Sequence, residues 1–328
     1  MRASDYEILF DLPDGECDAR ALDGVRTVTV RAGRSMEIMV HPTNRLTADA
    51  RREARERRTT PAMARINARN VERHMMRLIE ANFPATAYVV TGTYSYPVED
   101  YGLCAPDELS DIYDARGLPW DAKRVKMDVW NWLKKIKRRV KKSTGNAGDF
   151  RWIVRIEEGK QPPEQGLPPK YHFHAIIEAP GVSRETIESL WTHGHTRCER
   201  FDTENDGAAR LARYLNKQRS GGRWWSHSRN LVIPQPRVSD RKISRRRLAR
   251  IAADVQRSGR EILEALYPGY RVVELPDVRY SDFVPGAYIY ARLRASPEGC
   301  PQLRGGTAGV HAASRRVAPT SQRMRKRE

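Results

Sequence analysis

Two short apolar runs on either side of a polar loop constrain the fold of this 328-residue chain more than any other feature. Residues 150–157 and 171–178 are rich in β-branched and aromatic side chains, which is typical of buried strands. The Pro-, Gly- and Gln-containing stretch between them, residues 159–170, predicts a loop, so the two strands should pair as an antiparallel hairpin. Residues 86–96 have the same composition and predict a further strand.

Helical patterns lie between and after these strands. Residues 121–142 carry an apolar stripe at helical spacing and end in a cluster of Lys and Arg, where cations suit the helix dipole. Further helices are expected at 47–82, 184–191, 207–219 and 240–266, and strands within 271–293. Antiparallel strands mixed with helices indicate an α+β fold with a central antiparallel sheet and helices packed on it.

Composition divides the chain into four segments. An N-terminal extension, residues 1–82, contains short strands and then a helix, and a central domain follows at 83–235. Residues 236–295 form a basic helix and C-terminal strands. The basic tail, residues 296–328, is rich in Gly, Ala, Ser and Arg, and we expect it to be disordered.

The charge of the chain points to a polyanionic partner. Lys and Arg number 59 against 41 Asp and Glu, a formal net charge of +18, and nucleic acid is the simplest such partner. No apolar run approaches the roughly 18 residues of a membrane span, and the first residues lack a signal-peptide pattern. The four cysteines form no CxxC pair. We therefore expect a reduced, soluble, cytoplasmic protein.

His172 and His174 alternate on a predicted strand, so both imidazoles should project from one face. Such a pair can bind a divalent ion, although it also occurs by chance on solvated strands. Glu157 ends the preceding strand, and the hairpin would bring its carboxylate beside the histidines; Glu158 replaces it if the register slips by one residue. Two imidazoles and one carboxylate leave positions for substrate oxygens on Mg²⁺ or Mn²⁺.

Tyr214 and Lys217 lie three residues apart on a predicted helix and therefore share one face. A tyrosine can act as a covalent nucleophile, and a lysine beside it can contact phosphate oxygens. The structural alternative is a core tyrosine next to a lysine that extends to the surface.

Basic and aromatic side chains are the candidate DNA contacts. The basic candidates are Lys134, Lys135, Lys137, Arg138, Arg139, Lys141, Lys142, Arg245, Arg246 and Arg247. A run of charge usually marks a solvated face, but the net charge here favours phosphate contact and salt-sensitive binding. Trp224 and Trp225 can stack on unpaired bases, or can pack in the core.

The order of these motifs resembles that of the HUH endonuclease superfamily, specifically the rolling-circle replication initiators of bacterial phages and plasmids. Thr-Gly-Thr-Tyr-Ser at 91–95 resembles the first motif, His-Phe-His at 172–174 the second, and Tyr-Leu-Asn-Lys at 214–217 the third. Arg-Ile-Glu-Glu-Gly at 155–159 resembles the Glu-containing strand of phage initiators. The resemblance extends over roughly residues 83–295.

The resemblance implies a sheet of about five strands with the His pair on a central strand, and makes the central domain an HUH endonuclease. It implies that His172, His174 and Glu157 bind the metal while Tyr214, with Lys217, attacks a phosphate at a replication origin. The products would be a 5′-phosphotyrosine and a free 3′-OH, with later strand joining. Arg210 stands where some initiators carry a second tyrosine, so the resemblance is to single-tyrosine enzymes.

How one tyrosine completes both cleavage and joining is open; a second subunit, or a C-terminal tyrosine such as Tyr267 or Tyr270, could contribute. The implied partners are DNA, single-stranded or as an origin hairpin, and a host helicase and single-strand binding protein, since the chain has no Walker A motif. The implied setting is a bacterial cell, with the chain encoded by a phage, prophage or plasmid.

Two other functions stay open. A mobilisation or transposition enzyme of the same superfamily would use the same chemistry at a different DNA site. A basic nucleic-acid-binding regulator without catalysis would carry the histidines incidentally. Metal-dependent covalent chemistry distinguishes both enzymes from the regulator.

Overall fold

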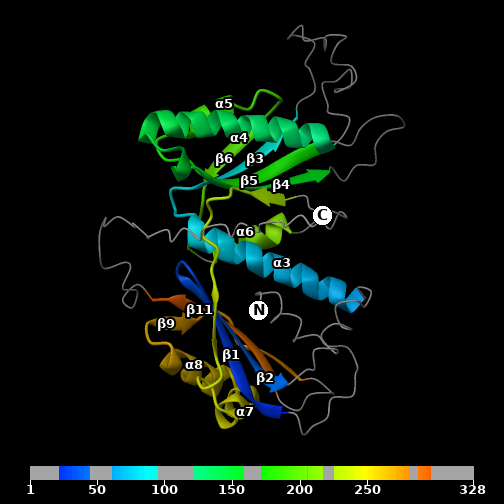
Figure 1. Cartoon of the computed structure of the whole chain (residues 1–328), viewed down its shortest axis with the longest axis vertical. Coiled ribbons are helices and arrows are strands. Elements are labelled where there is room, and N and C mark those ends of the chain that lie inside the picture. Colours follow the sequence, from blue (N-terminus) through cyan, green and yellow to red (C-terminus); the bar gives the residue numbers. More distant parts are fainter. Residues whose placement is uncertain are drawn as a thin grey trace, which may run out of the picture.

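The computed structural model describes residues 22–44, 61–94, 122–158, 171–204, 206–216, 225–280 and 287–296. They form two antiparallel sheets with helices between and outside them, so the predicted α+β class is confirmed. Figure 1 shows the sheets in two lobes, one above the other, with α3 and α6 in the layer between. Within these ranges, no helix is both long enough and apolar enough to cross a membrane.

The upper lobe contains a five-stranded sheet of order β6-β3-β5-β4-β7 in which all neighbours are antiparallel. Its strands are β3 (Tyr88–Thr93), β4 (Arg151–Glu158), β5 (Tyr171–Glu178), β6 (Thr196–Arg200) and β7 (Trp225–His227). β4 pairs with β5 along its whole length, from Arg151 opposite Glu178 to Glu158 opposite Tyr171. The predicted antiparallel pair and the central position of the His-x-His strand are therefore confirmed.

The outer face of this sheet is covered by α4 (Ala122–Thr144) and α5 (Arg184–Ser189). The apolar stripe predicted for α4 is buried and comprises Val125, Val129, Leu133, Ile136 and Val140. Phe173 of β5 is fully buried under α4, with its ring centroid 5.1 Å from that of Trp132. Gly92 of β3 is required beside it, since a Cβ there would lie 2.1 Å from the Phe173 ring.

The inner face of the five-stranded sheet is covered by α3 (Pro61–Asn82) and α6 (Gly207–Leu215). One apolar cluster joins these helices to the sheet and includes Met75, Leu78, Ile79, Ile153, Ile176, Ala212 and Leu215. α3 also contacts the lower lobe, where its buried Arg77 pairs with Glu37 of β2. α3 therefore packs against both sheets.

The lower lobe contains a six-stranded sheet of order β10-β11-β2-β1-β8, with β9 paired to β11. Its strands are β1 (Leu22–Ala32), β2 (Ser35–Asn44), β8 (Pro236–Ser239), β9 (Tyr270–Val272), β10 (Asp277–Tyr280) and β11 (Ala287–Ala295). The sequence did not indicate this second sheet, which joins strands from the first and third predicted segments. The four-segment division itself stays a prediction.

The helix predicted at 240–266 was wrong as a single element. The chain forms α7 (Arg245–Ala253), a short π-helix η6 (Val255–Gly259) and α8 (Arg260–Leu266). The Asp254 carboxylate breaks the helix because it accepts hydrogen bonds from the backbone N–H groups of Arg257 and Ser258, both at 3.1 Å. The strand region predicted at 271–293 divides likewise into β9, β10 and β11.

Other boundaries moved less. The strand predicted at 86–96 is described over Tyr88–Thr93, and the helix predicted at 207–219 ends at Leu215, with Asn216 as its C-cap. A short 3₁₀ helix, Ala147–Asp149, follows α4. The predicted disordered tail lies outside the described residues, except for Ser296.

Candidate functional site

The two histidines of β5 face α6, on the inner side of the five-stranded sheet. Strand alternation turns Phe173 to the opposite side, so the imidazoles of His172 and His174 stand together with ring centroids 5.1 Å apart. The register places Glu157 of β4 opposite His172, and Thr91 of β3 opposite His174. Three neighbouring strands therefore contribute side chains to one place.

Glu157, His172 and His174 offer one ligand atom each within 4.8 Å of one another. In the part of the chain that the structure describes, no other group of three or more His, Cys, Asp or Glu side chains does so. His172 Nε2 lies 3.4 Å from Glu157 Oε2, near the roughly 3 Å between adjacent ligands of an octahedral ion with bonds of about 2.1 Å. This donor set is compatible with a divalent metal. The register also turns Glu158 to the other face of the sheet, away from the histidines.

Arg155 supports the Glu157 carboxylate. Both side chains are buried, and Arg155 Nε donates to Glu157 Oε1 at 3.1 Å. Burial acts to raise the pKa of Glu157, but the hydrogen bond with His172 and the positive charges of His174 and Arg155 outweigh it, so the pKa is lowered. Glu157 is therefore an ionised ligand at neutral pH. Sequence reasoning missed Arg155, although its alternation with Glu157 was a usable signal.

His174 is held between two hydroxyl groups. Its Nδ1 lies 3.0 Å from Thr91 Oγ1, and its Nε2 lies 3.2 Å from the hydroxyl of Tyr214. Burial, together with the charge of His172, lowers the pKa of His174 to about 4. The imidazole is therefore neutral near pH 7 and retains a lone pair for a cation.

Tyr214 reaches the histidines from the last turn of α6. The buried side of α6 holds Ala212 and Leu215 against the sheet, while Tyr214 is 49% exposed and its ring centroid lies 4.8 Å from that of His174. Burial and the charge of Glu157 raise the pKa of the phenol. The tyrosine is therefore accessible to a substrate and stays protonated unless a cation binds beside it.

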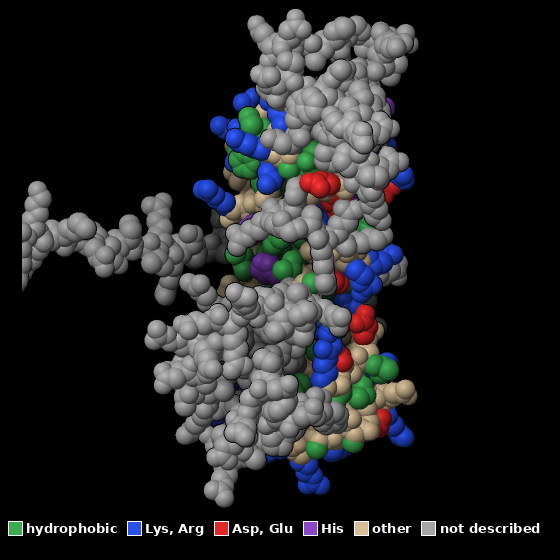
Figure 2. Space-filling view, turned by 90° about the vertical axis from the view of Figure 1, so that its right-hand side faces the viewer, with side chains coloured by type: hydrophobic (Ala, Val, Ile, Leu, Met, Phe, Trp, Pro, Cys, Tyr) green, Lys and Arg blue, Asp and Glu red, His purple; other side chains and the backbone are tan. Residues whose placement is uncertain are grey.

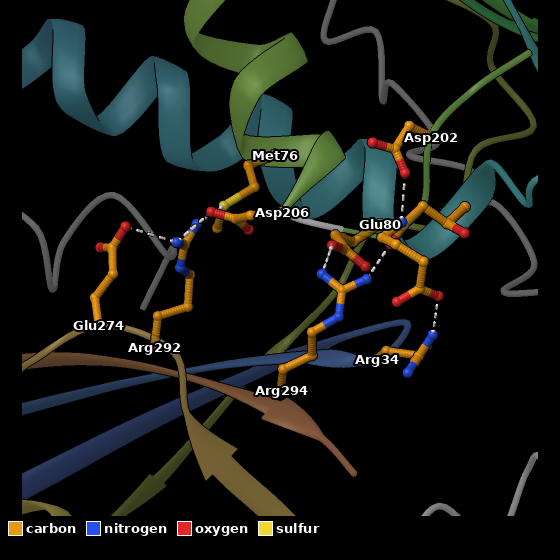
Figure 3. A network of polar contacts seen from close by, with 10 residues as sticks. Arg34, Met76, Glu80, Asp202, Asp206, Glu274, Arg292 and Arg294 are labelled. Atoms are coloured by element: carbon orange, nitrogen blue, oxygen red, sulfur yellow. Dashed lines mark hydrogen bonds and ion pairs between the residues drawn. The ribbon is translucent and has the colours of Figure 1, made fainter. Parts of the chain in front are cut away.

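The start of α6 is fixed by the lower lobe (Figure 3). Asp206, the N-cap, has a left-handed backbone with φ 63° and makes no side-chain cap bond, because its carboxylate pairs instead with the buried Arg292 of β11. Arg292 also donates to Glu274 at 3.0 Å. Further contacts around this segment are Arg34 with Glu204, Arg294 with Thr203 O and Glu80, and Arg210 with Asp202.

Most of the predicted DNA contacts lie away from the histidines. The basic side chains of α4 lie on the helix that covers the outer face of the sheet, opposite to the His pair, and Figure 2 shows Lys and Arg side chains around a hydrophobic patch on that lobe. Arg245, Arg246 and Arg247 are exposed at the start of α7, in the lower lobe. Lys217 and Trp224 lie outside the described residues.

Trp225 is the member of that set nearest the cluster. It lies on the edge strand β7 directly opposite Arg155, and it is half-buried. Its ring contacts those of His74, with centroids 6.3 Å apart, and His227, with centroids 5.6 Å apart. Both interpretations of this tryptophan, base stacking and packing, fit a side chain that is partly covered.

The two C-terminal tyrosines considered as partners of Tyr214 belong to the other lobe. The hydroxyl of Tyr267 lies 3.1 Å from Thr29 Oγ1, within the core of the six-stranded sheet. Tyr270 begins β9 of that sheet. Neither lies at the histidines of its own chain.

A family model described as replication-associated protein ORF2 matches residues 112–219. This range is about a third of the chain and contains α4, both histidines, Glu157 and Tyr214. No curated protein and no solved structure matches the chain. The family match supports a replication-associated protein of the Rep type.

Proposed function

We propose that this chain initiates rolling-circle replication by nicking one DNA strand at an origin with Tyr214. One observation carries the proposal: the Tyr214 hydroxyl lies 3.2 Å from His174 Nε2, in a cluster of two histidines and one carboxylate. The family match to replication-associated proteins spans all of these residues.

The chain's own groups divide the work of the cleavage step. Glu157, His172 and His174 hold a Mg²⁺ or Mn²⁺ ion, while Arg155 and Thr91 orient Glu157 and His174. The bound ion supplies Lewis-acid polarisation of the scissile phosphate. Lys217, which follows Tyr214 by three residues, contacts a phosphate oxygen.

Tyr214 is the nucleophile in this proposal. Its oxygen forms a bond to phosphorus while the bond from phosphorus to the 3′ oxygen breaks. The phenol loses a proton and the 3′ oxygen gains one, which leaves a 5′-phosphotyrosine and a free 3′-OH. Attack by a 3′-OH on this linkage reverses the step and reseals the strand. Initiation then requires a separate host helicase and a single-strand binding protein.

A gel assay tests this proposal. Single-stranded DNA pieces tiled across the replicon or genomic neighbourhood that encodes the chain are incubated with the protein and either Mn²⁺ or EDTA. We expect a protein–DNA band that survives SDS and boiling with Mn²⁺, and that disappears with EDTA or in Tyr214→Phe. DNA binding should persist in that variant, since only one hydroxyl group is lost.

Two results would contradict the proposal. An adduct that persists in Tyr214→Phe would assign the nucleophile to another residue. Tight binding that EDTA does not affect, with no adduct on any piece, would favour the non-catalytic regulator. An adduct at the ends of a mobile element, rather than at an origin, would keep the chemistry and assign it to mobilisation or transposition.

A further inference from the structure

A cavity of about 560 Å³ opens where α4 meets the β7 edge of the five-stranded sheet. Its apolar wall includes Trp130 of α4 and Trp152 of β4, whose rings meet edge to face with centroids 5.8 Å apart. Lys134, Lys137 and Arg229 supply its charge. No Asp or Glu is among the described residues that line it. The cavity therefore combines an aromatic wall with a purely positive rim.

Trp130 is exposed in a way that core packing does not require. Its side chain is 50% exposed, whereas the neighbouring Trp132 and Leu133 are buried and hold α4 on the sheet. Lys134 Nζ lies 5.8 Å from the centroid of the Trp130 ring, so a cation stands beside the open indole. An exposed indole flanked by cations is the arrangement that stacks on nucleobases and attracts their phosphates.

Hydrogen bonds hold the floor of the cavity in place. Asn230 Nδ2 donates to the carbonyls of Gly148 and Phe150, at 2.7 and 3.0 Å. The backbone N–H of Ser228 donates to Trp152 O at 2.9 Å, and Ser228 Oγ accepts from Trp152 N at 3.2 Å. The cavity is therefore formed before any ligand arrives, which lowers the entropic cost of binding.

Aromatic side chains connect this cavity with the tyrosine site. His227 lines the cavity, and its ring stacks on that of Trp225, with centroids 5.6 Å apart and 30° between the planes. Trp225 lies opposite Arg155, which binds Glu157. His227 lies opposite Ile153, four residues before Glu157 and about 13 Å from it along β4. A strand of DNA can follow these rings around the β7 edge.

We propose that this cavity binds an unpaired nucleotide of the DNA strand that Tyr214 cleaves. The base stacks on Trp130, and Lys134, Lys137 and Arg229 contact the adjoining phosphates. This inference rests on the proposed function, because it takes single-stranded DNA as the substrate. It adds a second site on that strand, on the opposite side of the sheet from the histidines.

Fluorescence anisotropy of a labelled oligothymidylate of about 16 nucleotides tests the cavity with the full chain. EDTA is present, so that binding is measured without cleavage. Trp130→Ala should raise the Kd about 5- to 150-fold, the range found when one stacking aromatic is removed. Trp130→Phe should retain most of the affinity. Lys134→Gln should lower the slope of log Kd against log salt by about 1.

Met127→Ala is the matched control, because Met127 is also 50% exposed on α4 and does not line the cavity. Its affinity should equal that of the unchanged chain. Equal affinities for Trp130→Ala and the unchanged chain would overturn the cavity assignment and leave the proposed nicking activity standing, since adducts are measured separately. Equal losses in Met127→Ala and Trp130→Ala would also overturn it. Failure of the unchanged chain to bind the oligonucleotide would overturn both proposals.

Discussion

The protonation states of individual side chains suit the cluster on β5 to cation binding. Burial keeps His174 neutral, and the positive neighbours of Glu157 keep that carboxylate ionised. A neutral imidazole and a carboxylate are the forms that bind a divalent ion. The same burial makes His174 a source of pH-dependent stability.

Unfolding measurements at two pH values test this state of His174. Its pKa is about 4 when folded and about 6.5 when unfolded, so the unfolded chain binds more protons between these values, and stability falls as the pH falls through that window. We expect this residue to lower the free energy of unfolding by about 2 kcal/mol from pH 7 to pH 5 in EDTA. His174→Gln should lose that much less in urea titrations; an equal loss in both proteins would contradict the assigned state.

At the scale of elements, α6 depends on strands far from it in sequence. Arg292 of β11 is buried and pairs with Asp206, the N-cap of α6, and with Glu274. Gly207 is required at the same point, since a Cβ there would meet the carbonyl oxygen of Asp202 at 1.7 Å. The lower lobe therefore sets the position from which Tyr214 approaches His174.

Arg292→Met should destabilise the protein by about 3–5 kcal/mol, the usual cost of removing one partner of a buried ion pair. Adduct formation by the fraction that stays folded should also slow, and Arg292→Lys should restore part of that rate. Arg271→Met is the control, since Arg271 pairs with Glu264 at an exposed position, where about 0–1 kcal/mol is expected. Urea unfolding and adduct kinetics measure the two effects. An Arg292→Met variant as stable and as fast as the control would contradict this role.

The elements that the sequence predicted are those with local signals. Strand alternation was sufficient to place His172 and His174 on one face, and the hairpin pattern was sufficient to bring Glu157 to them. The ends of helices were less predictable, because a single side chain such as Asp254 can break one by bonding to nearby backbone N–H groups. Arg155 and Thr91 were not predicted as partners, because their roles follow from the register between strands.

At the scale of the whole molecule, the six-stranded sheet was not predictable from local patterns. β1 pairs with β8 across more than 200 residues, as in Thr27 opposite Ser239, and no short-range signal reports such a pairing. The placement of α3 between two sheets follows from that topology. The charge of the chain was readable directly, but which lobe carries each basic segment was not.

The net charge of +18 predicts salt-sensitive binding by the whole chain. Removing the basic residues 297–328 should lower the slope of log Kd against log salt for single-stranded DNA, because phosphate contacts are lost. The adduct should still form, since Tyr214 and the histidines lie in the upper lobe. Anisotropy across a salt series and the gel assay measure the two properties. Loss of all adduct on truncation would place these residues in the active unit.

Mass spectrometry of the covalent adduct tests the central claim most directly. Trypsin cleaves after Arg213 and Lys217, so Tyr214 is released in the four-residue peptide Tyr-Leu-Asn-Lys. After nuclease digestion of the bound DNA, this peptide should carry the mass of a 5′-linked nucleotide in samples made with Mn²⁺ and lack it in samples made with EDTA. A nucleotide found on any other peptide, with Tyr-Leu-Asn-Lys unmodified, would contradict the assignment of Tyr214 as the nucleophile.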